Sequence, residues 1–171
     1  MKGKWAQGLR PRSFVWVINE RFAISQRPGG YAQNHRKVRR QEELLWIHGN
    51  EFTHVVSLLD GPHNLQAYVD MEIPYVHTPL RLGEDMPASL QQIYVTVAKL
   101  LENSQEKILM HDEEFGDRLI GVLAGFLMYN DTVPSPTNAI QLVEKLTKRV
   151  LGPEGRQIVQ VTVDEQIRKA G

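Results

Sequence analysis

The stretch KILMHDEEFGDRLIGVLAGFLMY, residues 107–129, carries the most informative pattern in the chain. Residues 108–110 are an apolar run typical of a short buried strand. From Arg118 onward the stretch is apolar nearly all round, which predicts a buried helix. Residues 111–118 between them are polar, include a glycine and form a loop by composition. The pattern therefore predicts a strand, a loop and a helix N-terminus in direct succession.

A loop between a strand and a helix N-terminus normally favours anions, because unpaired backbone N–H groups and the helix dipole both attract negative charge. This loop, however, carries four carboxylates and one arginine. The carboxylates belong to Asp112, Glu113, Glu114 and Asp117. The loop thus combines a backbone suited to anions with side chains that repel them.

Strand and helix patterns alternate along the rest of the chain. Residues 13–28 predict two short strands around a turn at Asn19 and Glu20, followed by a loop over residues 26–35. Further strands are expected within residues 53–60 and 74–80, and helices within residues 36–50, 64–71, 87–103, 135–152 and 153–168. This alternation predicts an α/β protein with a central, mainly parallel sheet flanked by helices.

The composition is that of an ordinary globular protein, with 42% hydrophobic and 23% charged residues. The length of 171 residues suits one domain, predicted over residues 14–168 after a flexible basic arm at residues 1–13. The formal net charge is zero, so the chain as a whole is not built to bind polyanions. It has neither the roughly 20 apolar residues of a membrane span nor the apolar segment of a secretory signal. The expected location is therefore cytoplasmic.

The chain contains no cysteine. This absence excludes disulfide bonds, thiolate metal ligands and a thiol nucleophile. Any covalent chemistry in the loop would therefore have to use a carboxylate, and carboxylate nucleophiles for phosphorus usually come with a metal ion that neutralises the charge.

Five segments follow one another in a recognisable order. They are WVINERFAISQRP (16–28), EELLWIHGNEFTHVVSLLD (42–60), YVHTPLRLGEDMPASLQQI (75–93), ILMHDEEFGDRLIGVLAGFLM (108–128) and SPTNAIQLV (135–143). Together they resemble the cysteine-dependent dual-specificity and tyrosine phosphatases, especially the small compact ones. The fourth segment is similar to the family signature, which reads histidine, cysteine, five residues, arginine and then serine or threonine. The resemblance covers residues 14–160 and implies a dual-specificity phosphatase-like fold.

The resemblance also implies a role for each position of the signature. In such an enzyme the cysteine thiolate attacks phosphorus, the arginine binds two phosphate oxygens, and the hydroxyl after the arginine stabilises the leaving thiolate. In this chain Asp112 stands at the cysteine position, Arg118 at the arginine position and Leu119 at the hydroxyl position. The nucleophile and its helper are therefore lost, whereas the arginine is kept.

The segment from His111 to Leu119 is thus identified as a degenerate phosphate loop. Its other members are His111, Glu113, Glu114, Phe115, Gly116 and Asp117, of which the histidine and the glycine match the family. The family's general acid, an aspartate on a separate loop, has its counterpart in RLGEDMP, where Glu84 or Asp85 can fill the role.

Charge argues against phosphate binding in this loop. Two unit charges about 4 Å apart interact by roughly 4 kcal/mol at an effective dielectric of about 20. The resemblance places Asp112 at the bottom of the pocket, where it would repel a phosphate dianion by an energy on the order of several kcal/mol. We therefore interpret Asp112 as a built-in substitute for phosphate, which accepts loop N–H groups and pairs with Arg118. The backbone arrangement is kept because it satisfies a strand end and a helix start.

These features predict a catalytically inactive phosphatase-like domain that acts as a protein-binding or regulatory module, without a cofactor. One alternative is a hydrolase that uses Asp112 with His111 and Glu84 or Asp85 in the remodelled pocket. A structural subunit of a larger assembly is another. The loop acids could hold a hard cation through oxygen ligands, but their spacing matches no known cation loop, so no metal is expected.

Two charged surfaces are candidates for binding a protein partner, and a solvated face is the alternative for each. The acidic rim of the loop can receive a segment rich in lysine or arginine. The basic run HRKVRRQ (35–41), joined by Lys4, Arg10 and Arg12, can receive an acidic partner or nucleic acid. No aromatic residue interleaves with this run, so nucleic acid is not expected. Trp5 in the arm is a further candidate anchor.

Overall fold

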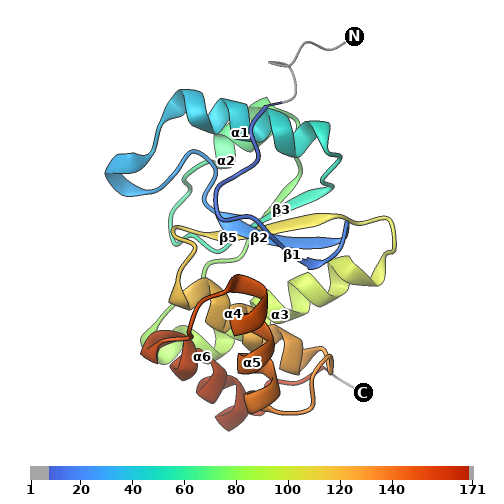
Figure 1. Ribbon diagram of the computed structural model, residues 1–171, viewed down its shortest axis with the longest axis vertical. Helices are drawn as coiled ribbons and strands as arrows, with labels where there is room; N and C mark the ends of the chain where they lie inside the picture. The colour runs from blue at the N-terminus through green and yellow to red at the C-terminus, as the bar shows by residue number, and fades with distance from the viewer. Residues whose placement is uncertain (1–7, 170–171) are drawn as a thin grey trace. The chain divides into compact units, whose positions relative to one another are not determined.

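The computed structural model describes residues 8–169, so the predictions for Lys4 and Trp5 lie outside the described residues. The chain divides into two compact units (Figure 1). Unit 1 contains the residues up to 77 and residues 100–115, whereas unit 2 contains residues 78–99 and the residues from 116 onward. This division does not decide whether residues 14–168 fold as one domain, which stays a prediction.

Unit 1 contains a five-stranded sheet in the order β1-β2-β5-β3-β4. Its strands are β1 (Val15–Ile18), β2 (Phe22–Gln26), β3 (His54–Ser57), β4 (Tyr75–His77) and β5 (Ile108–Asp112). β1 and β2 form an antiparallel hairpin, whereas the other neighbouring strands are parallel. The register places His111 of β5 between Ser25 of β2 and Ser57 of β3. The carboxyl ends of these three strands therefore meet at one edge of the sheet, where β5 ends.

Helices α1 (Lys37–Gly49) and α2 (Leu65–Asp70) lie on one face of this sheet (Figure 1). Leu44 and Ile47 point to the same side of α1, because residues three apart share a helix face. Both side chains are buried against the central strands. The core on this face consists of Ala23, Leu44, Ile47, Phe52, Val55, Tyr68, Ile73 and Leu109.

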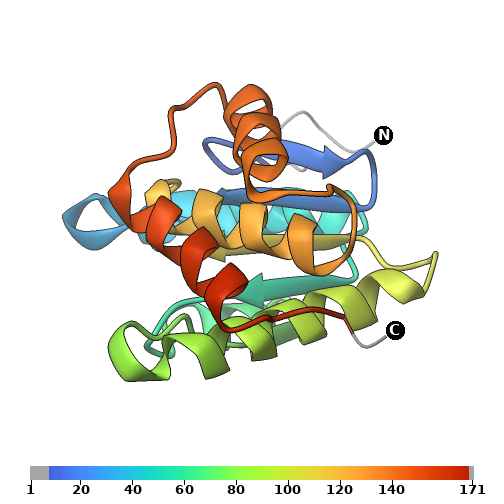
Figure 2. The same cartoon turned by 90° about the horizontal axis from the view of Figure 1, so that it is seen from below.

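Unit 2 is built from helices, which Figure 2 shows from below. They are α3 (Met86–Glu102, up to residue 99 in this unit), α4 (Asp117–Tyr129), α5 (Pro136–Thr147) and α6 (Pro153–Asp164), preceded by the 3-10 turn η3 (Gly83–Asp85). α4 is buried nearly all round, as its composition predicts, and packs against α5 and α6. A Cβ atom at Gly121 would lie 2.6 Å from the Cα atom of Gly155, so this close approach of α4 and α6 requires glycine.

The predicted α/β class with a mainly parallel sheet is confirmed. The observed strands and helices fall within the predicted segments to within a residue, except that β5 extends two residues beyond the predicted strand 108–110. His111 and Asp112, predicted as loop, pair with β2 and belong to the strand. The C-terminal segment 153–168, with its strand-like IVQVTV, is helical over α6. Ile158, Val159 and Thr162 are buried, and this packing outweighs the weak helix propensity of β-branched residues. Within residues 8–169, no helix is both long enough and apolar enough to cross a membrane.

The described part of the predicted arm, residues 8–13, has backbone partners in unit 1. The N–H group of Leu9 donates to the carbonyl of Glu42 in α1 over 3.0 Å. The carbonyl of Arg12 accepts the N–H group of Gln26, at the end of β2, over 3.2 Å. This segment therefore runs beside α1 and the carboxyl end of β2.

Candidate functional site

The degenerate phosphate loop joins β5 to α4, as the sequence predicts. β5 ends at Asp112, Gly116 is the N-cap residue of α4, and the helix begins at Asp117. The part up to Phe115 belongs to unit 1, whereas the part from Gly116 onward belongs to unit 2. The side chains of the two parts have different partners within their own units.

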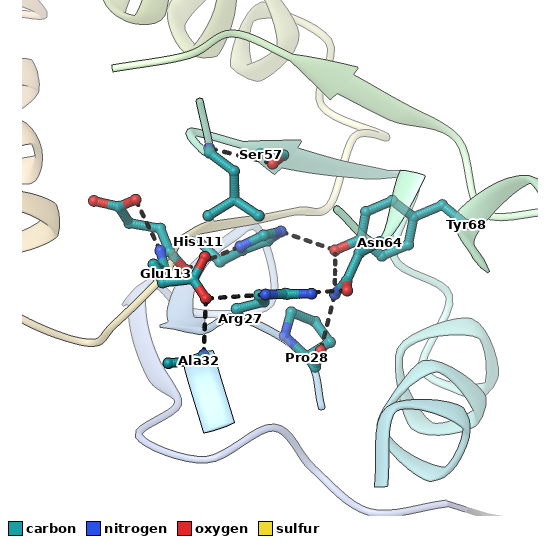
Figure 3. A network of polar contacts seen from close by, with 10 residues as sticks. Arg27, Pro28, Ala32, Ser57, Asn64, Tyr68, His111 and Glu113 are labelled. Carbon is teal, nitrogen blue, oxygen red and sulfur yellow. Dashed lines mark hydrogen bonds and ion pairs between the residues drawn. The ribbon is translucent and has the colours of Figure 1, made fainter. Parts of the chain in front are cut away.

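His111 is fully buried at the carboxyl end of β5 (Figure 3). Its Nδ1 atom lies 3.1 Å from the carbonyl oxygen of Asp112, which can only accept, so Nδ1 carries the proton and donates. Nε2 is then the acceptor, and it receives the hydroxyl proton of Tyr68 over 2.8 Å. Burial lowers the pKa of His111 to about 4 and raises the pKa of Tyr68 above its usual value. Both groups are therefore neutral at pH 7.

Asn64 extends this chain of hydrogen bonds. Its Nδ2 atom donates to the hydroxyl oxygen of Tyr68 over 3.4 Å and to the carbonyl of Pro28 over 2.8 Å. Its Oδ1 atom accepts from Nε of Arg27 over 3.1 Å. The side-chain amide of Asn64 therefore donates and accepts at the same time. Together with the hydroxyl of Tyr68, it links Arg27 to His111 by hydrogen bonds of fixed direction (Figure 3).

Arg27 also forms an ion pair with the loop. Its Nη1 atom lies 2.9 Å from Oε1 of Glu113, and the same oxygen accepts the N–H group of Ala32 over 3.2 Å. Arg27 is only 7% exposed, so this contact is shielded more than a surface ion pair. The sequence analysis assigned Glu113 to an acidic rim, with a solvated face as the alternative. Residues 27–32 fold back over the loop, so this carboxylate, whose side chain stays 37% exposed, pairs with a buried guanidinium.

The turn that carries Arg27 is itself braced by α1. Gly29 and Gly30 both have φ values near +90°, in the left-handed region that glycine enters without strain. The N–H group of Gly29 donates to Oε2 of Glu43 over 2.8 Å, and Oε1 of Glu43 receives Nε of Arg39 over 2.6 Å. Glu43 is 2% exposed. A buried carboxylate on α1 therefore holds the segment that reaches the loop.

Asp112 is half-buried, and its Oδ1 atom accepts the N–H group of Glu113 over 2.8 Å. The interpretation that this carboxylate accepts a loop N–H group is thereby confirmed for one amide. An anion bound from solvent would compete with the carboxylate for that amide. The pairing of Asp112 with Arg118 stays a prediction.

In unit 2 the carboxylate of Asp117 acts as a cap for another helix. Its Oδ1 atom accepts the N–H group of Gly152 over 2.6 Å, and its Oδ2 atom accepts that of Gly155 over 2.7 Å. Gly152 is the N-cap residue of α6 and has no side chain that could cap the helix. Asp117 is therefore a structural residue that ties α4 to the positive end of α6 rather than part of a solvated rim.

Arg118, the retained arginine, makes two contacts with Glu154 in the first turn of α6. Its Nε atom lies 3.1 Å from Oε2 of this carboxylate, and its Nη2 atom lies 3.3 Å from Oε1. Both side chains are about half exposed, which limits the strength of the pair. Leu119, at the expected hydroxyl position, is fully buried in the core.

The remaining predicted site residues differ in exposure. Phe115 is buried. Glu114 is exposed, as the predicted acidic rim of the loop requires. Glu84 and Asp85 are exposed in the turn η3 before α3. Their role as a general acid stays a prediction. Within residues 8–169, no three histidine, aspartate or glutamate side chains are placed to hold a metal ion.

Comparison with known proteins identifies the fold. No protein-family model and no curated protein matches the chain. Among solved structures, it is similar to a kinase-associated phosphatase with serine in place of the catalytic cysteine (20% identity, TM-score 0.71, covering 84% of this chain and 86% of that one). It is also similar to Tk-PTP in its active form (19%, 0.69, 91% and 99%) and to a variant of human DUSP28 (15%, 0.62, 92% and 97%).

These neighbours are dual-specificity and tyrosine phosphatases, so the chain has the fold that the signature-like segment implied. The residues that the sequence analysis missed are Arg27, Asn64 and Tyr68. Arg27 stands beside a Pro-Gly-Gly turn, which is a signal of a fixed bend, but nothing local names its partner. Asn64 is the N-cap residue of α2 and Tyr68 follows four residues later in the helix, a spacing that is a weaker signal for a polar contact.

Proposed function

We propose that this chain, which has a dual-specificity phosphatase-like fold, is a catalytically inactive protein-binding or regulatory module of the cytoplasm. The observation that carries the proposal is the carboxylate of Asp112, which occupies the position expected for the nucleophile and accepts the loop N–H group of Glu113. None of the 171 residues is a cysteine, so no other residue can supply a thiolate.

Two observations on the rest of the loop support this proposal. Glu113 and Asp117 add negative charge, and each is already bound to groups of the protein itself. A phosphoester would meet the repulsion of Asp112, which is on the order of several kcal/mol for a dianion at close range. Binding of phosphate in the loop is therefore expected to be too weak for turnover.

The geometry does not favour the hydrolase alternative. A general base needs an accessible nitrogen or oxygen near the substrate. His111 is fully buried, and both of its ring nitrogens are in hydrogen bonds. With its pKa lowered to about 4, it cannot donate a proton at neutral pH. Of the residues proposed for hydrolysis, His111 is the one that ordinarily titrates near pH 7, and its burial removes it as an acid or a base.

The test is a phosphatase assay with a generic aryl phosphate on the wild-type chain and on Asp112→Cys. Asp112→Ser serves as the matched control, because it removes the same charge without supplying a thiol. The double variant Asp112→Cys with Leu119→Ser restores both lost groups. Leu119 is buried, so its truncation costs about 2–5 kcal/mol, and thermal unfolding must be recorded for each variant.

We expect no turnover by the wild type or by Asp112→Ser, with or without magnesium. Turnover by folded Asp112→Cys would show that replacement of the nucleophile alone made the chain inactive, whereas turnover by the double variant alone would show that both lost groups are needed. If every cysteine variant folds and none turns over, the pocket has changed beyond the nucleophile, and the inactive assignment stands. Wild-type turnover that disappears in Asp112→Asn would overturn the proposal and establish a carboxylate mechanism.

A further inference from the structure

We infer that a cavity at the ends of α4, α5 and α6 binds a small zwitterion with an apolar side chain. Such a molecule carries an ammonium group and a carboxylate, as a free apolar amino acid or a dipeptide does. The ligand goes beyond the proposed protein-binding function, because none of the residues from His111 to Leu119 lines the cavity.

The cavity belongs to unit 2 alone. Its volume is about 440 Å³, which lies within the range of small-molecule sites in proteins. The walls come from the last turn of α4, the loop after it, the start of α5, and the last turn of α6 with the segment that follows. The lining residues that matter for recognition are Asp131, Arg168, Met128, Val133, Val163 and Ile167.

Two opposite charges line this cavity, and both side chains are exposed. They are the carboxylate of Asp131 and the guanidinium of Arg168. Within residues 8–169, neither group makes an ion pair or a side-chain hydrogen bond, either with the other or with a third residue. Both charges therefore remain available to a ligand that carries the complementary pair.

The backbone attaches both charged residues to the same helix end. The N–H group of Asp131 donates to the carbonyl of Met128 in α4 over 3.1 Å. The residue after Arg168 is attached in the same way, because the N–H group of Lys169 donates to the carbonyl of Tyr129 over 3.3 Å. A ligand would therefore have to order only the side chains, which limits the entropy lost on binding.

The helix ends favour the same two charges. α5 begins beside the cavity with Ser135 as the N-cap residue and Pro136 in its first turn, and a helix N-terminus favours a carboxylate. α4 ends at the cavity near Asp131, and a helix C-terminus favours a cation such as an ammonium group.

Aliphatic side chains form the apolar part of the wall. Ile167 is only 4% exposed, whereas Val163 is 37% exposed. Met128 and Val133 are partly buried. An apolar side chain of the ligand would remove the exposed part of Val163 from water, which is favourable in proportion to the apolar area buried.

A ligand with a single charge fits this cavity less well. A simple anion would attract Arg168 but meet the repulsion of Asp131, and a simple cation would do the reverse. A neutral apolar molecule would cover both charges without compensating either one. Only a ligand with both charges compensates both, so the geometry favours a zwitterion.

The basic run at residues 35–41 offers no comparable site. Its cations do not lie on one side of α1, because Arg40 has a buried Nε atom and Arg39 pairs with the buried carboxylate of Glu43 over 2.6 Å. Binding of an acidic partner to this run stays a prediction.

The test is isothermal titration calorimetry on the full chain with L-leucine and with leucyl-leucine, which distinguishes a free amino acid from a dipeptide. Three control compounds each lack one part of the ligand. N-acetyl-leucine lacks the ammonium group, leucinamide lacks the carboxylate, and glycine lacks the apolar side chain.

Two variants each remove one charge and nearly keep the size of the side chain. Asp131→Asn should fold, because Asp131 has a φ value of 56° and asparagine also adopts this left-handed conformation. Arg168→Gln should fold because Arg168 is exposed. The matched controls are Asp70→Asn and Arg12→Gln, which make the same changes at exposed positions of unit 1.

We expect leucine or leucyl-leucine to bind the wild type at millimolar concentrations, and the control compounds to bind much more weakly. Asp131→Asn and Arg168→Gln should each weaken binding about tenfold, and the two matched controls should keep the wild-type affinity. Absence of binding by both ligands, equal binding of a control compound, or equal weakening by the matched controls would overturn the inference. The proposed inactive function is tested by phosphoester turnover, so the two claims can fail separately.

Discussion

Glu113 and Asp117 stand four residues apart in one loop, yet their carboxylates stabilise the protein in different ways. Glu113 faces a charged partner, the guanidinium of Arg27, which is itself buried in the polar network of unit 1. The carboxylate of Asp117 instead accepts two backbone N–H groups at the start of α6.

The difference teaches that an acidic loop is not by itself a binding site. A carboxylate that meets a buried guanidinium is held by a charge-assisted contact, which is stronger than a hydrogen bond between neutral groups. A carboxylate at a helix N-terminus is held by the partial charges of the backbone, which is a weaker interaction. Four predictions follow this comparison from the strong polar network to the weak helix ends.

The pH dependence of stability should give the largest effect. The pKa of His111 is about 4 in the folded chain, below the ordinary value of 6.5, because burial disfavours the imidazolium. Between these values the unfolded chain binds the additional proton, so stability is highest above pH 6.5 and falls as the pH drops towards 4. The loss should be about 3 kcal/mol for this one group.

The measurement is urea unfolding at several pH values on the wild type and on His111→Gln. The slope of stability against pH is the readout, not its absolute level, because the variant also changes the network. Parallel slopes for the two proteins would show that His111 does not titrate as its burial requires.

Arg27→Met should lower the free energy of unfolding by about 2–3 kcal/mol, chiefly because the buried Oδ1 atom of Asn64 loses its donor. The variant leaves Glu113 without its cation and Asn64 without the donor to its Oδ1 atom. The control Glu113→Gln removes the charge and keeps an acceptor oxygen, so we expect a loss of only about 1 kcal/mol. Chemical denaturation measures both, and an equal loss in the two variants would show that the hydrogen bond from Arg27 to the buried Oδ1 atom of Asn64 contributes nothing.

Asp117→Ala should destabilise the protein by about 1–2 kcal/mol, since two N–H groups at the start of α6 lose their acceptor. Asp117→Asn keeps one acceptor oxygen and should lose about half as much. Hydrogen exchange at the amides of Gly152 and Gly155 gives a local readout. If these amides stay protected in the alanine variant, Asp117 is not the group that caps α6.

The smallest effect concerns α1, where the helix has neither a cap nor an acid. Lys37→Glu should raise the free energy of unfolding by about 0.5 kcal/mol, because it replaces an unfavourable charge by a favourable one. High salt should remove the gain, since Lys37 is exposed. A loss of stability at low salt would mean that the lysine has a partner on the surface.

The elements of the fold could be predicted from local patterns, and the exceptions have physical reasons. Strands of three to five residues were found because apolar runs between turn residues report burial directly. Residues 153–168 were harder to assign, because IVQVTV has the propensity of a strand, whereas the pairing of Gly121 with Gly155 and the cap from Asp117 favour a helix there. Those interactions involve α4, and no local window contains them.

The sequence by itself determined the strand, loop and helix around Asp112, the absence of a thiol and the excess of acid in the loop. These follow from the identity and the order of neighbouring residues. Only the tertiary structure decided which acids remain accessible. Glu113 finds Arg27 across 86 positions of the chain, and Asp117 finds Gly152 across 35. The reason is that periodicity reports which side of an element is buried, whereas a salt bridge or a distant cap depends on where the sheet and the packed helices bring separate segments together.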